Sequence, residues 1–225
     1  MKTGITAIVA AVAMVAAVAS TSRAQDPTKV DPAHYKVILD NPSVRVLRIT
    51  YPAGSKSKMH QHPDSMVVGL STGKIQFTMP DGTTQDSNLQ AGEAMFTPAG
   101  THLPSNVGKT TMEAILVEFK SPQPGTATIP ATLPDRQVKT LAESPHGNAS
   151  LVTLEPSFHE PAGTKHDYDQ VVIALGPSQV SLAIDGKPAK TTWKRGDVSF
   201  IGRGVAHESK NTGTKPVDVI IVAIK

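Results

Sequence analysis

The sequence predicts an all-β protein made of two tandem β-barrels, because the chain is duplicated and its apolar residues alternate. Segments 106–120 and 211–225 have equal length and share Asn, Gly, Ile, Val and a final Lys in register, 105 residues apart. A repeat this long indicates a duplicated domain, since solenoid units repeat roughly every 20 to 50 residues. Apolar residues recur with a period of two, and no window after Ala24 keeps the period of 3.6 that is typical of a helix.

Each copy carries the same strand and turn signals in the same order. Large apolar residues occupy every second position over residues 75–79 before Asp81-Gly82, and over residues 180–184 before Asp185-Gly186, where a hairpin should turn. The last strand of each copy is so apolar that we expect it to be buried on both faces. Short strands with frequent Gly and Pro turns indicate a sandwich or a barrel, and closure into a barrel protects the strand edges.

The start of the chain resembles an export signal. Lys2 is followed by an apolar run over residues 5–19, and Ser22-Arg23-Ala24 forms a small-x-small cleavage site before Gln25. Fifteen apolar residues fall short of the ~20 that span a bilayer as a helix. We therefore expect a cleaved signal peptide and a periplasmic or extracellular protein, with an uncleaved N-terminal anchor as the alternative.

The expected organisation follows from the leader, the repeat and a proline-rich stretch between the two copies. Four prolines in that stretch favour an extended, semi-rigid linker. The chain has no cysteine, so no disulfide can stabilise it. The predicted parts are a signal peptide at 1–24, a first barrel at 25–120, a linker at 121–135 and a second barrel at 136–225.

Composition excludes some classes of partner. Hydrophobic residues make up 39% of the chain and charged residues 18%, which is ordinary for a globular protein. The net charge is only +3, no Lys/Arg cluster is present, and nine residues are aromatic, so nucleic-acid binding is not expected. We expect a small-molecule ligand or substrate, no membrane contact after cleavage, and possibly a homo-oligomer.

The eight histidines include a candidate chelate. His60 and His62 are separated by one residue, so in an extended segment both imidazoles project from the same face. His102 follows the turn 98–101 and can supply a third ligand near the same barrel mouth. Three neutral imidazoles suit Zn, Cu, Fe or Ni and leave positions open for water, dioxygen or a substrate oxygen. A His-x-His pair by itself also fits a polar rim without a metal.

Two multi-residue motifs contain these histidines. Their residues are Gly54, His60-Gln61-His62, Met66 and Gly73 in the first, and Gly92, Pro98-Ala99-Gly100, His102 and Asn106 in the second. In order and separation they resemble the two motifs of the cupin superfamily, with one residue fewer before His102. The duplicated chain is similar to a bicupin of the "cupin 2, conserved barrel" group over nearly all of its length after the leader. This resemblance implies jelly-roll barrels and a metal held by His60, His62 and His102.

The first copy departs from the family pattern at the carboxylate position, where Met66 stands. The resemblance therefore carries over three histidine ligands and no glutamate. Met66 is interpreted as barrel packing, with a weak soft ligand that would favour copper as the alternative. Asp64 could substitute as a carboxylate, but it falls in the turn after His62 and is expected to be a solvated turn residue.

The second copy has lost more of the pattern. His166 matches His62, Gln170 matches Met66, His207 is kept, and Thr164 stands where His60 would be. The possible degenerate second site therefore consists of His166, Gln170 and His207, and one metal per chain is expected.

Other residues could complete that second site by an unusual route. The candidates are His159, Asp167 and Asp169. His34 and His146 have no spacing partner and are expected at the surface.

Three function classes remain open on the sequence. The first is a metal-dependent, dioxygenase-like oxidoreductase using one divalent transition metal among Fe, Cu, Mn, Ni and Zn. Cupins with three histidine ligands often use Fe(II), as the resemblance implies, whereas the Irving–Williams order favours copper outside the cytoplasm. The second is a non-catalytic protein that binds a small molecule or sugar. The third is zinc-dependent hydrolysis or isomerisation, for which no acid/base partner stands out. A serine hydrolase is least favoured because no G-x-S-x-G elbow occurs.

Overall fold

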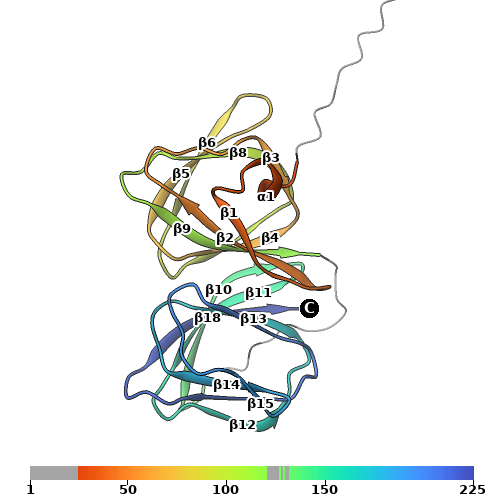
Figure 1. Cartoon of the computed structure of the whole chain (residues 1–225), viewed down its shortest axis with the longest axis vertical. Helices are drawn as coiled ribbons and strands as arrows, with labels where there is room; N and C mark the ends of the chain where they lie inside the picture. The colour runs from red at the N-terminus through yellow and green to blue at the C-terminus, as the bar shows by residue number, and fades with distance from the viewer. Residues whose placement is uncertain (1–24, 121–126, 128, 130–131) are drawn as a thin grey trace, which may run out of the picture.

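The computed structural model describes residues 25–120, 127, 129 and 132–225 (Figure 1). The predicted signal peptide lies outside these residues, as does most of the predicted linker. The first half contains one short helix, α1 (Pro27–Val30), and nine strands. These strands are β1 (Tyr35–Asp40), β2 (Val44–Tyr51), β3 (His60–His62), β4 (Ser65–Gly69), β5 (Gly73–Thr78), β6 (Thr84–Leu89), β7 (Ala94–Thr97), β8 (Gly100–Asn106) and β9 (Met112–Phe119).

The second half contains nine strands and no described helix. They are β10 (Arg136–Ser144), β11 (Gly147–Leu154), β12 (His159–Thr164), β13 (Asp169–Ala174), β14 (Val180–Ile184), β15 (Lys187–Lys190), β16 (Val198–Ile201), β17 (His207–Asn211) and β18 (Val217–Ile224). No helix in the described part of the chain has the length and apolar character needed to cross a membrane.

Both halves have the same strand order, which confirms the all-β prediction. The first half pairs β1-β2-β9-β4-β7 in one sheet and β3-β8-β5-β6 in the other. The second half pairs β10-β11-β18-β13-β16 and β12-β17-β14-β15. Every pairing between these strands is antiparallel, and each pair in one half has its counterpart in the other. The two halves are therefore equivalent jelly-roll barrels.

The predicted turns close corresponding hairpins. Gly82 has a φ of +85° after β5, and Asp185 and Gly186 have φ values of +48° and +71° after β14. These left-handed conformations explain the Asp-Gly pairs, because glycine adopts positive φ without steric cost.

In each barrel a buried asparagine connects neighbouring strands through hydrogen bonds of its side chain. It is the last residue of β8 in the first barrel and of β17 in the second. The Asn106 side-chain amide donates to the carbonyls of Tyr51 (2.8 Å), Pro52 (3.1 Å) and Thr110 (2.8 Å). Asn211 donates in the same way to two carbonyls of the second barrel. The asparagine of the second motif therefore has a structural role, satisfying buried carbonyls of neighbouring strands.

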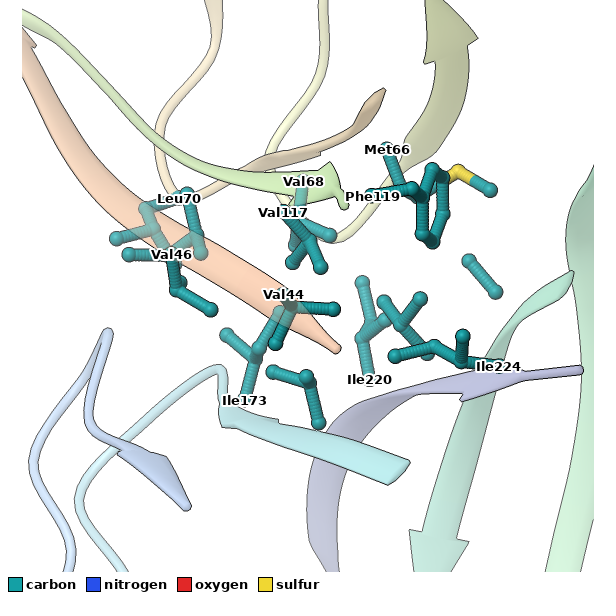
Figure 2. Packing of buried hydrophobic residues seen from close by; sticks show 14 residues of the cluster. Val44, Val46, Met66, Val68, Leu70, Val117, Phe119, Ile173, Ile220 and Ile224 are labelled. Atoms are coloured by element: carbon teal, nitrogen blue, oxygen red, sulfur yellow. The ribbon is translucent and has the colours of Figure 1, made fainter. Parts of the chain in front are cut away.

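The two barrels share one hydrophobic core, which lies between their five-stranded sheets (Figure 2). Residues of both halves meet there, including Val44, Met66 and Val117 from the first and Ile173 and Ile220 from the second. Met66 is fully buried in this cluster. The interpretation of Met66 as packing is confirmed, and its role as a soft ligand is wrong.

Polar contacts surround this shared core. Ser43 donates to Asp169 at 2.6 Å, and Arg195 Nη1 donates to the carbonyl of Leu70 at 2.6 Å. His146 Nε2 lies 2.8 Å from Asp64, and its ring stacks on Phe119 at 4.9 Å. His146 is therefore part of the contact between the barrels and not a free surface residue, which corrects the sequence-based expectation. Asp64 is likewise paired rather than only solvated.

Equivalent residues meet across the contact in both directions. A Cβ added to Gly196 would lie 2.7 Å from Leu70 Cδ1, and one added to Gly92 would lie 3.7 Å from Leu175 Cδ1. Leu70 and Leu175 follow equivalent strands, and the two glycines precede equivalent strands. The contact therefore has the reciprocal character of an isologous interface.

The described part of the predicted linker contacts the second barrel. Ala127 is buried against Tyr168 and Ala223, and its carbonyl accepts from Asn148 at 2.7 Å. The strand β10 begins at Arg136, where the second barrel was expected to start.

Candidate metal centre and cavity

The three histidines predicted as ligands lie on two neighbouring strands of the first barrel. His60 and His62 are on β3, and His102 on β8 pairs directly with His60. Ring centroids are 5.2 Å apart for His60 and His102 and 4.8 Å apart for His62 and His102. His60 is 1% exposed and His62 is 5% exposed. The fold thus gathers the three imidazoles inside the barrel.

Hydrogen bonds set the tautomer of the β3 pair. His60 Nδ1 lies 2.9 Å from the Lys58 carbonyl, and His62 Nδ1 lies 2.8 Å from the Pro63 carbonyl. A carbonyl only accepts, so each Nδ1 carries the hydrogen and each neutral ring keeps a lone pair on Nε2. This is the arrangement in which histidine ligates metals, with the outer nitrogen bonded to the backbone.

Burial keeps the rings of His60 and His102 neutral. It lowers the pKa of His60 and lowers that of His102 to about 3, with the neighbouring histidines adding to the shift of His102. At neutral pH both side chains are therefore uncharged imidazoles. The donor chemistry fits a divalent transition metal.

The nitrogen of His60 that would bind a metal, Nε2, already has a hydrogen-bond partner. Its Nε2 lies 3.1 Å from the Tyr35 hydroxyl, which in turn accepts from the Tyr51 hydroxyl at 2.7 Å. Among the described residues these three histidines do not bring one ligand atom each within 4.8 Å of the others. The three side chains are therefore near one another but do not converge on one point as a bound metal would require. A metal bound at His60 Nε2 would replace the Tyr35 hydroxyl as the partner of that nitrogen.

A cavity of about 390 Å³ adjoins the histidines. That volume suits a small organic molecule. Phe77 lines it and lies 4.6 Å from the His102 ring between centroids. The described residues of the lining are mostly apolar and include Ile75, Met79, Leu89, Met112 and Leu116; none of them is Asp, Glu, Lys or Arg.

The residue that lies at the family's carboxylate position in the structure is one residue later than the sequence comparison indicated. Successive strand residues face opposite sides, and it is Val67, not Met66, that lines the cavity. Gln170 lines the cavity of the second barrel, but it pairs with Ala223 as Ser65 pairs with Glu118. Gln170 therefore corresponds to Ser65, and the match of Gln170 to Met66 was one residue out of register.

The second barrel holds a three-residue group that could bind a metal ion. Glu160, His166 and His207 bring one ligand atom each within 4.8 Å of one another. Glu160 Oε1 lies 3.7 Å from His166 Nε2, and Glu160 Oε2 lies 3.3 Å from His207 Nε2. Thr164 pairs with His207 as His60 pairs with His102, so the loss of one imidazole was predicted correctly.

Two of the sequence-based candidates for completing this site, His159 and Asp169, have other partners. His159 is half-exposed and lies 3.2 Å from Glu208. Asp169 accepts from Ser43 and from the backbone of Arg203. Glu160 was missed because it lies outside the motif spacing, beyond a register shift between Glu160 and Thr164.

One signal for Glu160 comes from the pairing of the two copies. Glu160 pairs with Ser209, which corresponds to Pro104 when Asn211 is placed on Asn106, and Pro104 accepts from the backbone of Ser57 in the first barrel. A serine in one copy thus corresponds to a glutamate in the other. This gain of a charge was visible once the copies were placed in register.

The electrostatics of the second group differ from those of the first. Burial raises the pKa of Glu160, but hydrogen bonds from His207, Arg136 and Ser209 outweigh it and bring the pKa to about 2. Burial lowers the pKa of His207, but its hydrogen bond to Glu160 outweighs burial and raises the pKa. The adjoining cavity measures only about 60 Å³.

Solved structures share this fold at low sequence identity. No family model matches the chain, and no curated protein is similar to it in sequence. A cupin 2 conserved barrel domain protein from Leptotrichia buccalis is 13% identical, with a TM-score of 0.57, and the match covers 85% of this chain and 88% of that one. The oxalate decarboxylase of Lactobacillus farciminis, in a formate complex, is 11% identical, with a TM-score of 0.59 and coverage of 82% and 78%.

A third similar structure is the salicylate 1,2-dioxygenase of Pseudoaminobacter salicylatoxidans in its adducts with gentisate. It is 12% identical, with a TM-score of 0.61 and coverage of 83% of this chain and 70% of that one. The chain therefore has the cupin fold. Because a decarboxylase and a dioxygenase share this fold, the likeness does not select a reaction.

Proposed function

We propose that this protein is an exported bicupin that binds one divalent transition metal through His60, His62 and His102. In this proposal it is a dioxygenase-like oxidoreductase acting on a small organic molecule. The observation that carries the proposal is the three imidazoles on neighbouring strands, with His60 and His102 held neutral, beside an apolar cavity of about 390 Å³. The export part rests on the leader alone.

The cavity lining favours oxidation over hydrolysis. Zinc-dependent hydrolysis or isomerisation needs a group that moves a proton, and no carboxylate or lysine lines this cavity. A bound metal would supply Lewis acidity and redox chemistry toward dioxygen at its open positions. The chain itself would bind the apolar body of the substrate and exclude water from it.

The residues near His60 would orient a polar group of the substrate. The Tyr35 hydroxyl lines the cavity and would be released from His60 when a metal binds. It could then donate to a substrate oxygen, while Phe77 and the aliphatic lining contact the ring or chain. A small aromatic or aliphatic acid or phenol fits this combination.

The second candidate function is non-catalytic binding of a small molecule or sugar by the same barrel. The observation that favours it is that no carboxylate or lysine occurs among the described residues that line the cavity. A sugar would need more hydrogen-bonding partners than this lining offers, so an apolar ligand fits better.

Metal content and oxygen uptake test the proposal. Protein made without a chelating tag should contain about one Fe, Cu, Mn, Ni or Zn per chain. The metal should be lost in His62→Ala and His102→Ala and kept in the control His159→Ala. Oxygen uptake with a panel of small phenols and aromatic acids should depend on that metal. Metal without uptake supports the binding function, and a chain that takes up no metal refutes the metal-dependent oxidoreductase.

A further inference from the structure

Arg136 of the second barrel is buried at the group formed by Glu160, His166 and His207. Its Nη1 lies 2.7 Å from Glu160 Oε1, and its guanidinium lies over the Phe158 ring at 4.7 Å. Its side chain is 13% exposed and lines the same small cavity. A cation therefore already stands beside the carboxylate.

Both oxygens of Glu160 are taken by groups of the chain. Oε1 accepts from Arg136, and Oε2 accepts from Ser209 at 2.8 Å and from His207 at 3.3 Å. The other ring nitrogen of His207 lies 3.3 Å from the Val205 carbonyl. Since both nitrogens of His207 face acceptors, both serve as donors and neither offers a lone pair to a metal.

The histidines at equivalent positions of the two barrels therefore differ in whether their interior nitrogen has a free lone pair. In the first barrel the outer nitrogens of His60 and His62 bond to the backbone and leave lone pairs inside. In the second barrel the interior nitrogen of His207, Nε2, already forms a hydrogen bond with Glu160. As they are arranged, the residues of the second barrel do not fit a metal ion.

Strand register shows that the carboxylate and the guanidinium are both particular to the second barrel. Val138 pairs with Val152, as Tyr35 pairs with Ile49 in the first barrel. Two residues earlier, Arg136 corresponds by this count to Ala33.

Two further positions differ at this end of the barrel. Glu160 corresponds to Ser57, and Thr164 corresponds to His60. The second barrel thus lacks one imidazole and has gained a carboxylate together with its own cation.

We infer that Arg136 occupies the place of a metal ion in the second barrel, and that Glu160, His166 and His207 form a divalent-cation site that the guanidinium keeps closed. Two histidines and one carboxylate are a common ligand set for divalent transition metals. The adjoining volume of about 60 Å³ has room for an ion with a water molecule. This inference does not depend on whether the first barrel holds a metal.

The test replaces the arginine in a background that lacks the first site. The parent carries His60→Ala and His62→Ala, and the test variant adds Arg136→Met, which keeps the length of the side chain without its charge. Cobalt(II) titration by visible absorbance, metal analysis and thermal unfolding are measured on both. Removing one partner of this ion pair leaves the charge of Glu160 uncompensated. A divalent ion would compensate that charge, so Arg136→Met should bind Co²⁺ or Zn²⁺ roughly 100-fold or more tightly than the parent.

Two further variants identify the ligands. Adding His207→Ala to Arg136→Met should abolish the gained site. Arg45→Met is the matched control, because Arg45 forms an ion pair with the buried Glu118 of the first barrel. That carboxylate belongs to no three-ligand group in the described residues, so the control should gain no metal.

Each result decides the inference. One metal per chain in Arg136→Met and none in the parent support it. If Arg136→Met unfolds without metal, recovery of the folded state on adding Zn²⁺ supports it equally. A parent that binds a metal lost on His207→Ala would overturn it, because the arginine would then not exclude the ion. A folded Arg136→Met without metal, or one that Zn²⁺ does not restore, would also overturn it.

Discussion

Substituting Met66 by alanine should destabilise the entire chain and not only the first barrel. Met66 is fully buried in the core that the two five-stranded sheets share. Truncation of a buried Met to Ala costs about 2–5 kcal/mol. At about 2–4 °C per kcal/mol for a chain of this size, a loss of about 3 kcal/mol lowers Tm by about 6–12 °C. Because residues of both barrels contact this cluster, the loss should appear in one cooperative transition.

Calorimetry of three variants tests this prediction. Met66→Ala in the first barrel and Ile173→Ala in the second should each shift a single transition by a similar amount. The control Val37→Ala, at a position that is 47% exposed, should leave Tm almost unchanged. Two separate transitions, with Met66→Ala moving only one of them, would show that the shared core does not couple the barrels.

Three further outcomes are expected. Tyr35→Phe removes the hydrogen bond to His60, which is worth about 1 kcal/mol, so calorimetric titration should show metal binding about fivefold tighter; weaker binding would show that the Tyr35 oxygen helps to hold the metal. The unfolded chain protonates His102 near its ordinary pKa of 6.5, but the native chain does so only at about 3, so metal-free protein should lose stability as pH falls from 6.5 toward 3. His102→Gln should reduce the drop in Tm between pH 7 and pH 5, and an equal drop in both proteins would contradict this reasoning. Asn106→Ala leaves buried carbonyls unpaired and should cost about 3 kcal/mol in a denaturant titration, whereas a loss below about 0.5 kcal/mol would assign those carbonyls other partners.

Local sequence signals predicted the architecture because they are repeated and periodic. The Asp-Gly turns and the alternating strands follow from backbone geometry that acts within a few residues, and the repeat of about 105 residues shows that the same set of strands occurs twice. The pairing of His60 with His102 was also accessible, since the spacing of His60 and His62 fixes one face and the turn before His102 limits the other.

The remaining parts of the site depend on contacts that spacing does not encode. A shift of one residue reverses the face of a strand, which is why Met66 was placed in the ligand position that Val67 occupies. Glu160 enters the second site through an irregular pairing before Thr164. Arg136 reaches it from a strand that carries no motif.

The reciprocal contact between the barrels is more stable because both barrels belong to one chain. Two separate barrels joined by such a face would dissociate on dilution, whereas a covalent link holds the second face at an effective concentration of about millimolar or more. The second barrel therefore supports the first through the outer surface of one sheet, whatever its interior contains. The residues inside the second barrel take no part in this contact. An imidazole there can therefore be replaced by an ion pair while the second barrel still stabilises the first.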